Sequence, residues 1–569
     1  MNKDVYNVSM PELKLFDVCC DIKTVKVPMR DGVKLHTQIF FPPEMAETAP
    51  VLLFRTPYSR TTWLDLPSQL ALKHRCVYIM QACRGTGFSE GGVFHPSDRD
   101  VEKNDAEDFF AWLKTQSWFN GRCAMLGASY PGWVQWCAMR AADNPLVGIS
   151  PRVAPLYSCF TAARKGGGAA LSFAQHWPIS MYHRRTYGYE NVPDYIAMQM
   201  SSHLPAVEAD LFAGYGNPLP VYRDFIAGTA APGEALKDYD AGFDKFSAPA
   251  FVSGGWFDGF KQETIESFQL LQQRGATAEA RNFSRLTLGP WGHPGLLNPE
   301  LFGAENDYRE LLPREEKFLT GLLNDPASDP LPGEKQVKYF LLGENKWHDA
   351  DTWPPQGTTS QTFYLHSGGN ANTFNGDGII NAVPPQTELP DQYVSNPAEP
   401  VTSQRGNTLA AGCYDRSYME KRTDMLVYTS EKFTDPLTVT GNVKLRFFAS
   451  ATTPDTDFFA TITDVTPDGK SMLLTTGMVR ARFAKSLHSP ELLTPGKIYR
   501  FEIDLGDTAV KFLPGHALRL ELCGQEFPAF ERNANTGNTP MHDTELRTSC
   551  HTIYHDAAHP AELILPVLA

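Results

Sequence analysis

Short apolar runs alternate with amphipathic stretches between residues 21 and about 150, and this alternation predicts an α/β domain. Three of the runs fit short buried strands that end in turn residues, at 51–54, 77–80 and 123–126. Between the last two runs, the segment 105–114 carries Phe109, Phe110 and Leu113 at helical spacing. We therefore expect a crossover helix in this segment.

The pattern changes from residue 151 to 242, where the strand rhythm disappears and glycine, alanine and aromatic residues become frequent. Apolar runs that fit strands return at 250–253 and 285–288. The intervening segment therefore interrupts one domain and does not separate two. We predict a single α/β domain formed by residues 1–150 and 243–354, with residues 151–242 inserted as a mostly helical cap.

Beyond about residue 355 the helical periodicity nearly vanishes, and glycine, proline, threonine and asparagine become frequent. Apolar and charged residues alternate with a period of two in the segments 443–447 and 499–505, which is typical of strands that bury one face. Regular short strands over about 200 residues favour a sandwich or jelly roll. We expect an all-β jelly-roll domain at 355–569.

Composition narrows the class of protein. A chain of 569 residues with 42% hydrophobic and 12% aromatic residues can bury a large core, which a disordered chain cannot. The 51 basic and 65 acidic residues give a net charge of −14, which disfavours nucleic acid and anionic membranes as partners. No run approaches the roughly 20 apolar residues of a membrane span, and residues 1–20 lack a secretory apolar core. These features predict a cytoplasmic protein.

The cysteines and histidines predict no metal site. The ten cysteines are scattered without paired C-x-x-C spacing, and no H-E-x-x-H motif occurs. We expect buried reduced thiols and no cofactor. Whether the chain forms a homo-oligomer stays open.

The strongest chemical signal is a Gly-Ala-Ser-Tyr-Pro-Gly turn at 127–132, which follows the predicted strand at 123–126 and precedes an apolar helix. Small residues around Ser129 are typical of a nucleophile elbow, a tight turn that lifts a serine hydroxyl above the sheet. The pattern departs from G-x-S-x-G, because Pro131 holds the second glycine position and Gly132 comes one residue later. Since a lone turn of this kind also fits a structural role, its context must decide.

Two later loops supply that context. Asp258 follows the strand predicted at 250–253, and His293 follows the strand predicted at 285–288, each through a short glycine-rich loop. Nucleophile, acid and histidine then occur in the order of the α/β-hydrolases, with each partner at the carboxyl end of a strand. We predict that Ser129, Asp258 and His293 form a catalytic triad.

Several motifs together give a specific resemblance over nearly the whole chain. They lie at 27–33, 55–58, 84–91, 127–132, 255–260, 289–293 and 512–516. The chain resembles the cocaine esterase-like hydrolases, relatives of X-Pro dipeptidyl-peptidases, glutaryl-cephalosporin acylases and α-amino acid ester hydrolases. The resemblance implies Ser129 as nucleophile, His293 as base, Asp258 as its orienting acid, a helical cap and a C-terminal jelly roll.

The resemblance also implies an unusual oxyanion hole, in which the backbone N–H of Tyr130 and the hydroxyl of Tyr58 are the two donors. The absence of a His-Gly-Gly-Gly segment in the sequence agrees with a side-chain donor. The alternative, that Tyr58 is only a packed turn residue after Pro57, stays open at this stage.

The substrate is less determined. Amino-acid-specific relatives place extra carboxylates beside the acid of the triad, whereas Gly259, Phe260 and Lys261 follow Asp258 here. We therefore expect a serine esterase or acylase that cleaves a small ester or amide with a non-peptide or N-blocked acyl group. Trp256 and Phe260 are candidates for an apolar acyl pocket, and Lys261 is a candidate contact for a distal carboxylate such as a glutaryl group.

Three alternatives stay open: an X-Pro dipeptidyl-peptidase, an α-amino acid ester hydrolase and, more remotely, a non-catalytic glycan- or partner-binding protein. The last of these predicts a broken triad.

Overall fold

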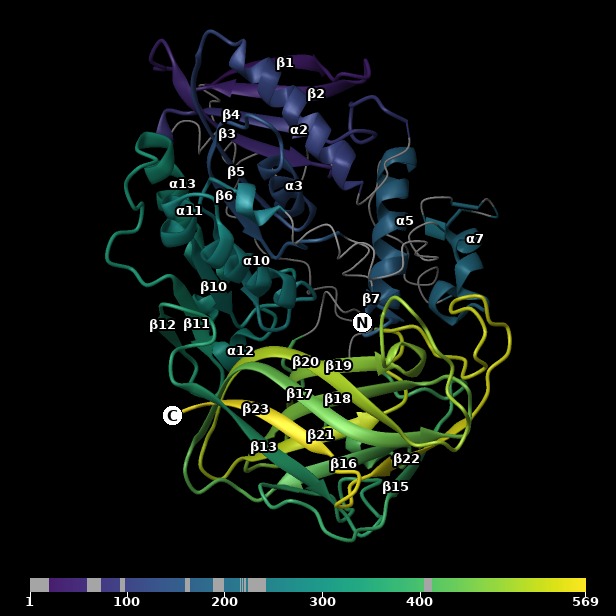
Figure 1. Ribbon diagram of the computed structural model, residues 1–569. Helices are drawn as coiled ribbons and strands as arrows, with labels where there is room; N and C mark the ends of the chain where they lie inside the picture. Colours follow the sequence, from purple (N-terminus) through teal and green to yellow (C-terminus); the bar gives the residue numbers. More distant parts are fainter. Residues whose placement is uncertain are drawn as a thin grey trace.

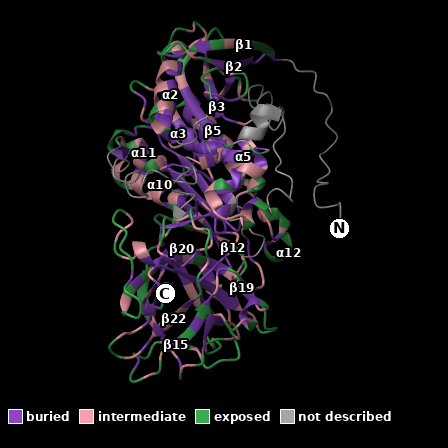
Figure 2. Cartoon of the chain, turned by 90° about the vertical axis from the view of Figure 1, so that its right-hand side faces the viewer, coloured by how far each residue is buried: buried purple, intermediate pink, exposed green. Residues whose placement is uncertain are grey.

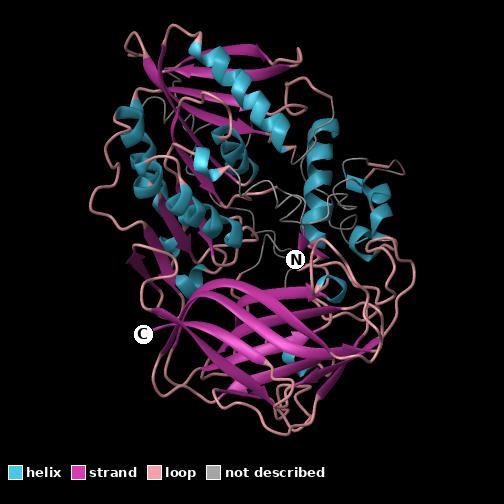
Figure 3. Ribbon diagram, in the orientation of Figure 1, coloured by secondary structure: helices cyan, strands magenta, loops and turns pink. Residues whose placement is uncertain are grey.

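The computed structural model describes residues 20–58, 73–92, 98–158, 164–187, 199–214, 216, 218–219, 222–223, 242–403 and 412–569. The α/β domain lies above the all-β domain, and helices α5 and α7 of the inserted segment lie beside the α/β domain and above the β domain (Figure 1). Helices gather in the upper domain and strands dominate the lower one (Figure 3).

A ten-stranded sheet forms the centre of the α/β domain, in the order β1-β2-β4-β3-β5-β6-β9-β10-β11-β12. Its strands are β1 (Asp21–Pro28), β2 (Lys34–Phe41), β3 (Ala49–Thr56), β4 (Val77–Ala82), β5 (Phe119–Ala128), β6 (Leu146–Arg152), β9 (Phe251–Gly255), β10 (Arg285–Gly289), β11 (Val337–Leu341) and β12 (Lys346–Ala350). The strands from β4 to β11 in this order run parallel. The predicted α/β architecture is confirmed.

Helices cover both faces of this sheet. They are α2 (Arg99–Lys114), α3 (Tyr130–Met139), α10 (Lys261–Arg274), α11 (Ala278–Phe283), α12 (Pro299–Phe302) and α13 (Leu312–Asn324). Neighbouring residues of β3 pack on opposite faces: Leu53 belongs to the cluster that contains Phe109 of α2, and Leu52 to the cluster that contains Phe318 of α13. Such two-sided burial explains why these strands are continuous apolar runs.

The crossover helix expected at 105–114 begins six residues earlier. Asp98 caps α2 by accepting a hydrogen bond from the N–H of Val101 at 3.1 Å. The first turn carries charged side chains, and the apolar spacing used for the prediction begins only after it.

The inserted segment contains a hairpin and two α-helices in its described part: β7 (Arg164–Lys165), β8 (Gly168–Ala169), α5 (Leu171–Tyr187) and α7 (Asp210–Ala213). It leaves the sheet after β6 and returns to it at β9, as the sequence pattern predicted. The division of the chain at 150, 242 and 354 stays a prediction.

The C-terminal domain is built from an eleven-stranded sheet. Its strands are β13 (Thr358–His366), β14 (Ile379–Asn381), β15 (Asp391–Ser395), β16 (Met425–Ser430), β17 (Leu437–Ala451), β18 (Asp457–Val465), β19 (Ser471–Arg480), β20 (Tyr499–Phe512), β21 (Ala517–Cys523), β22 (Ser549–Tyr554) and β23 (Glu562–Leu568). Alternate residues of β17 are buried against those of β20, where Leu445 pairs with Ile503 and Phe447 with Phe501. The predicted β-rich C-terminal domain is therefore confirmed.

Strand β20 also joins the two domains. The N–H of Leu342, at the end of β11, donates to the carbonyl of Ala509 at 3.0 Å, and the N–H of Lys511 donates to the carbonyl of Leu342 at 2.8 Å. The indole of Trp353 donates to Asp507 at 2.6 Å.

Buried residues fill the interior of both domains (Figure 2). No helix among the described residues is long and apolar enough to cross a membrane.

Candidate active site

Ser129 stands at a strained turn between β5 and α3. Its φ is 63°, in the left-handed region that side chains other than glycine rarely adopt. A Cβ on Gly127 would lie 2.5 Å from Cβ of Pro131, and a Cβ on Gly132 would lie 2.5 Å from Cβ of Ala154. Both positions therefore require glycine, and the second glycine comes one residue late because α3 approaches the chain after β6 at Gly132.

Two loops bring an acid and a base to this serine. Nε2 of His293 lies 3.0 Å from Oγ of Ser129, and Nδ1 of His293 lies 2.8 Å from Oδ2 of Asp258. The three side chains come from the carboxyl ends of β5, β9 and β10. The structure thus brings together all three residues predicted from chain order.

Asp258 is held by its own loop and by the loop of His293. Its side chain is buried, and its Oδ1 accepts a hydrogen bond from the N–H of Phe260 at 2.6 Å. The N–H of Trp256 donates to the carbonyl of Gly289, and the N–H of Phe257 donates to the carbonyl of Trp291, both at 2.9 Å. These bonds join the two loops, so Oδ2 of the carboxylate faces the imidazole.

Tyr58 follows the end of β3 and also lies beside Ser129. Its hydroxyl donates to Oγ of Ser129 at 3.5 Å, and it accepts a hydrogen bond from Nε1 of Trp177 at 3.4 Å. Tyr130 is the first residue of helix α3 and directly follows Ser129, so its backbone N–H lies next to the serine. Both predicted oxyanion donors therefore flank the candidate nucleophile.

A buried ion pair holds the side chain of Tyr130. Its hydroxyl donates to Oε1 of Glu102 at 3.0 Å, and Oε2 of Glu102 lies 3.1 Å from Nη2 of Arg55. Burial raises the pKa of Glu102, and the guanidinium of Arg55 partly opposes that shift. The sequence analysis assigned no role in the site to Glu102, Trp177 or Arg55. The position of Arg55, three residues before Tyr58 in the same motif, could have indicated that it lies near the site.

The three predicted substrate contacts lie in different places. Phe260 is buried, and its ring meets the ring of His293 edge to face at 5.3 Å. The indole of Trp256 donates to the carbonyl of Phe340 at 2.7 Å and packs on Trp353. Among the three side chains, only the ring of Phe260 has a described contact with the candidate triad, while the backbone N–H of Lys261 donates to the carbonyl of Asp258 at 3.2 Å.

Lys261 turns toward the β domain. Its Nζ donates to Oγ1 of Thr475 at 3.3 Å, and burial lowers its pKa to about 8. The sequence could not foresee this placement, because Thr475 lies 214 residues further along the chain. Within the described ranges, no group of three or more His, Cys, Asp or Glu residues is arranged to hold a metal ion.

Comparisons with known proteins show the family of the chain. Residues 31–295 match the model of the X-Pro dipeptidyl-peptidase (S15) family, and residues 332–564 match that of the X-Pro dipeptidyl-peptidase C-terminal non-catalytic domain. The chain is 31% identical to the cocaine esterase of Rhodococcus sp. (strain MB1 Bresler), over 96% of this chain and 98% of that protein.

Solved structures show the same fold. An aminopeptidase from a Thaumarchaeota archaeon is similar with a TM-score of 0.82 and 22% identity, over 100% of this chain and 99% of that one. An α-amino acid ester hydrolase is similar with a TM-score of 0.80 and 21% identity, over 100% of both chains. The architecture is that of an α/β-hydrolase with a C-terminal β-rich domain.

Proposed function

The chain belongs to the cocaine esterase family of serine ester hydrolases, and we propose that Ser129, His293 and Asp258 are its catalytic triad. One observation carries this proposal: hydrogen bonds of 3.0 and 2.8 Å link the serine hydroxyl through the imidazole to a buried carboxylate. This is the geometry of a nucleophile, its base and the group that orients the base.

The reaction follows from the positions of these groups. Oγ of Ser129 attacks the substrate carbonyl while Nε2 of His293 takes its proton, and Asp258 stabilises the resulting imidazolium. The oxyanion forms between the N–H of Tyr130 and the hydroxyl of Tyr58. His293 then protonates the leaving alcohol or amine, and water, activated by the same imidazole, releases the acid from the acyl-enzyme.

We propose a small ester or amide with a non-peptide or N-blocked acyl group as the substrate. Aromatic rings around the nucleophile support this choice, since Phe173 packs against both Trp177 and Phe260 at 6.0 Å. The residues that directly follow Asp258 supply no carboxylate to bind a free α-ammonium. An X-Pro dipeptidyl-peptidase or an α-amino acid ester hydrolase would need such a group from elsewhere.

A fluorophosphonate probe tests the nucleophile. We expect one covalent adduct, located on Ser129 by peptide mass spectrometry and missing from Ser129→Ala protein of unchanged melting temperature. The variant should also lose hydrolysis of an activated ester. Labelling at another serine, or full activity of Ser129→Ala, would refute the assignment.

A substrate panel tests the acyl group. It contains neutral aryl esters, the matching amides, esters of free amino acids and an X-Pro anilide. We expect the highest kcat/KM on the neutral esters, whereas a preference for the X-Pro anilide or the amino-acid esters would favour those alternatives.

A further inference from the structure

A cavity of about 570 Å³ is lined by residues of both the α/β domain and the β domain, and it borders Asp258 of the candidate triad. The loop after β9 forms one wall with Asp258 and Gly259, and strands β19 and β20 form the opposite wall. The hairpin β7–β8 of the inserted segment closes a third side with Lys165 and Gly166. The cavity therefore lies where all three parts of the chain meet.

The carboxylates of its described lining already have partners. Asp258 is bound to His293, and Glu263 accepts hydrogen bonds from the backbone N–H groups of Leu156 and Tyr157. Glu502 accepts hydrogen bonds from the side chains of Lys444 and Arg446, and Glu526 accepts one from Arg416. Asp504 accepts hydrogen bonds from the side chain of Asn442 and the backbone N–H of Gly506. Each of these contacts lies between 2.6 and 3.2 Å. Each of these carboxylates is therefore already hydrogen-bonded or ion-paired without a contact to Lys165.

The cations of the lining differ from one another. Arg416 is buried between Glu521 and Glu526, and Lys261 donates to Thr475. Lys165 is the one charged side chain among the described lining residues that has no hydrogen-bond or ion-pair partner in the described part of the chain. The N–H donors of its ammonium are therefore available to a group bound inside the cavity.

The hairpin that carries Lys165 is fixed to the β domain. Gly166 and Gly167 have φ values of 53° and 91°, and a Cβ on Gly166 would lie 2.0 Å from the carbonyl oxygen of Met478. The N–H of Arg480 donates to the carbonyl of Gly166 at 2.8 Å. Only glycine allows this close approach, so the turn holds the lysine at the wall of the cavity.

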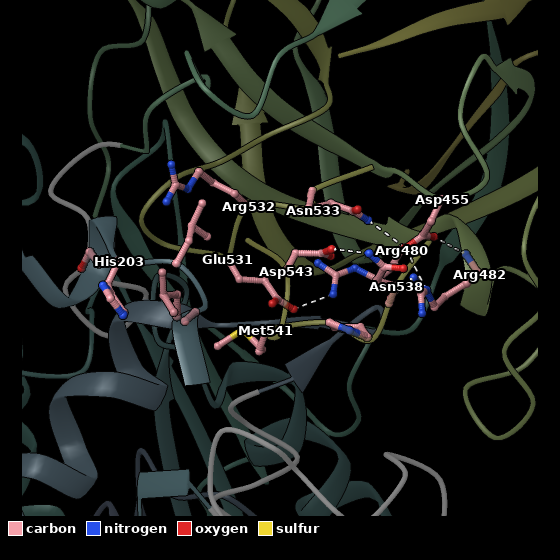
Figure 4. Close-up of a pocket in the computed structure, with 16 residues that line it drawn as sticks. His203, Asp455, Arg480, Arg482, Glu531, Arg532, Asn533, Asn538, Met541 and Asp543 are labelled. Carbon is pink, nitrogen blue, oxygen red and sulfur yellow. Dashed lines mark hydrogen bonds and ion pairs between the residues drawn. The ribbon is translucent and has the colours of Figure 1, made fainter. Parts of the chain in front are cut away.

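Strand β8 continues the same attachment. The N–H of Glu531 donates to the carbonyl of Ala169 at 2.9 Å, and Oε1 of Glu531 accepts the N–H of Ala169 at 3.2 Å. Glu531 also pairs with Arg480, and Figure 4 shows these two side chains together with Asp455 and Arg482. The lysine therefore stands on a rigid support.

An ammonium in such surroundings favours an anionic ligand. Lys165 is an exposed side chain at the wall of this cavity. The protein around it removes part of its hydration and so lowers its pKa, and the nearby carboxylates, of which Asp258 acts most strongly, oppose this shift without reaching hydrogen-bond distance. A carboxylate at hydrogen-bond distance would compensate the lost hydration.

We propose that this cavity is a binding subsite for a carboxylate, recognised by the ammonium of Lys165. The link to catalysis rests on the proposed function: because Asp258 and Gly259 border the cavity, the carboxylate is the distal end of an acyl chain attached to the reacting carbonyl. A separate small dicarboxylate would offer the same chemistry, and the experiment distinguishes the two sources.

The first arm measures kcat/KM on pairs of activated aryl esters of increasing chain length. One member of each pair ends in a carboxylate, and the other carries a neutral methyl ester at the same position. At one chain length we expect the carboxylate member to be favoured by about tenfold or more, as a charge-assisted hydrogen bond implies. Lys165→Met should bring this ratio close to one, and Lys165→Arg should retain part of it.

The matched control is Lys335→Met, which removes an exposed lysine paired with Asp351 on the surface. It should leave the ratio unchanged. The neutral ester reports on the catalytic machinery in every variant, and a melting curve reports on folding. If Lys165→Met does not fold, Lys165→Gln replaces it.

The second arm measures binding of free straight-chain dicarboxylates to Ser129→Ala protein by calorimetry. Binding that is lost in the Ser129→Ala, Lys165→Met double variant supports the subsite. Competition with the neutral ester in active enzyme then assigns the carboxylate to the acyl chain, and inhibition or activation without competition assigns it to a separate ligand.

Two results would overturn the subsite: no preference at any chain length together with no dicarboxylate binding, or a preference that survives Lys165→Met. Failure of the proposed function is distinguishable, since it would appear as no hydrolysis of any ester and no adduct on Ser129.

Discussion

Replacing Tyr58 with phenylalanine removes one hydroxyl and keeps the ring. In the resting enzyme that hydroxyl lies 3.5 Å from Oγ of Ser129, which is longer than the 2.7–2.8 Å typical of O–H···O hydrogen bonds. It therefore contributes little to ground-state binding. Trp177 fixes the phenol oxygen from the other side, so the donor is already oriented toward charge that develops in the transition state.

This geometry sets the expected size of the effect. Loss of one oxyanion-hole donor raises the barrier by about 2.7–4 kcal/mol, or roughly 10² to 10³ in kcat. KM should change far less, because the interaction is made mainly in the transition state. The lost hydrogen bond from Trp177 would reduce stability by about 1 kcal/mol, a separate effect that appears in the melting temperature and not in kcat.

The assay is steady-state kinetics on an activated ester, with a thermal melt of each variant. Tyr222→Phe is the matched control, because Tyr222 is a buried tyrosine of the inserted segment whose hydroxyl donates to the carbonyl of Ala206 at 2.8 Å. It should lower the melting temperature and leave kcat unchanged. A kcat within a fewfold of wild type for folded Tyr58→Phe would refute the reasoning and place the second donor elsewhere.

Three further predictions concern Asp258, the buried Glu263 and the β domain. Asp258→Asn should lower kcat about 10⁴-fold by favouring the wrong tautomer of His293, and single-turnover rates check this; a loss below tenfold would identify another acid. Burial raises the pKa of Glu263 to about 7, so its contribution to stability is present at low pH and is lost as pH rises from its usual range near 4.5 through 7. Between pH 5 and 8, the melting temperature measured by differential scanning fluorimetry should therefore fall less for Glu263→Gln than for wild type. Equal falls would contradict the raised pKa of the Glu263 carboxyl. A fragment of residues 1–354 should be insoluble or inactive, because the contacts of Trp353 and Lys261 with the β domain would be exposed; expression of a soluble, fully active fragment would disprove this dependence.

The sequence by itself determined the layered architecture and the candidate triad. Strands such as β3 are apolar on both faces because helices cover both sides of the sheet, and that composition is visible without coordinates. The elbow at Ser129 could be predicted because a tight turn against neighbouring backbone requires glycine at Gly127 and Gly132. Asp258 and His293 followed from chain order, since parallel strands end at one edge of the sheet.

The tertiary structure alone decided which side chains from distant segments meet. Trp177 reaches Tyr58 across 119 residues, and Lys261 reaches Thr475 across 214 residues. Lys165, on a glycine turn with no periodic pattern, became a cavity residue only through docking of its hairpin on β19. Local periodicity reports which face of an element is buried, but not which partner covers it, because that partner depends on how separately formed layers pack.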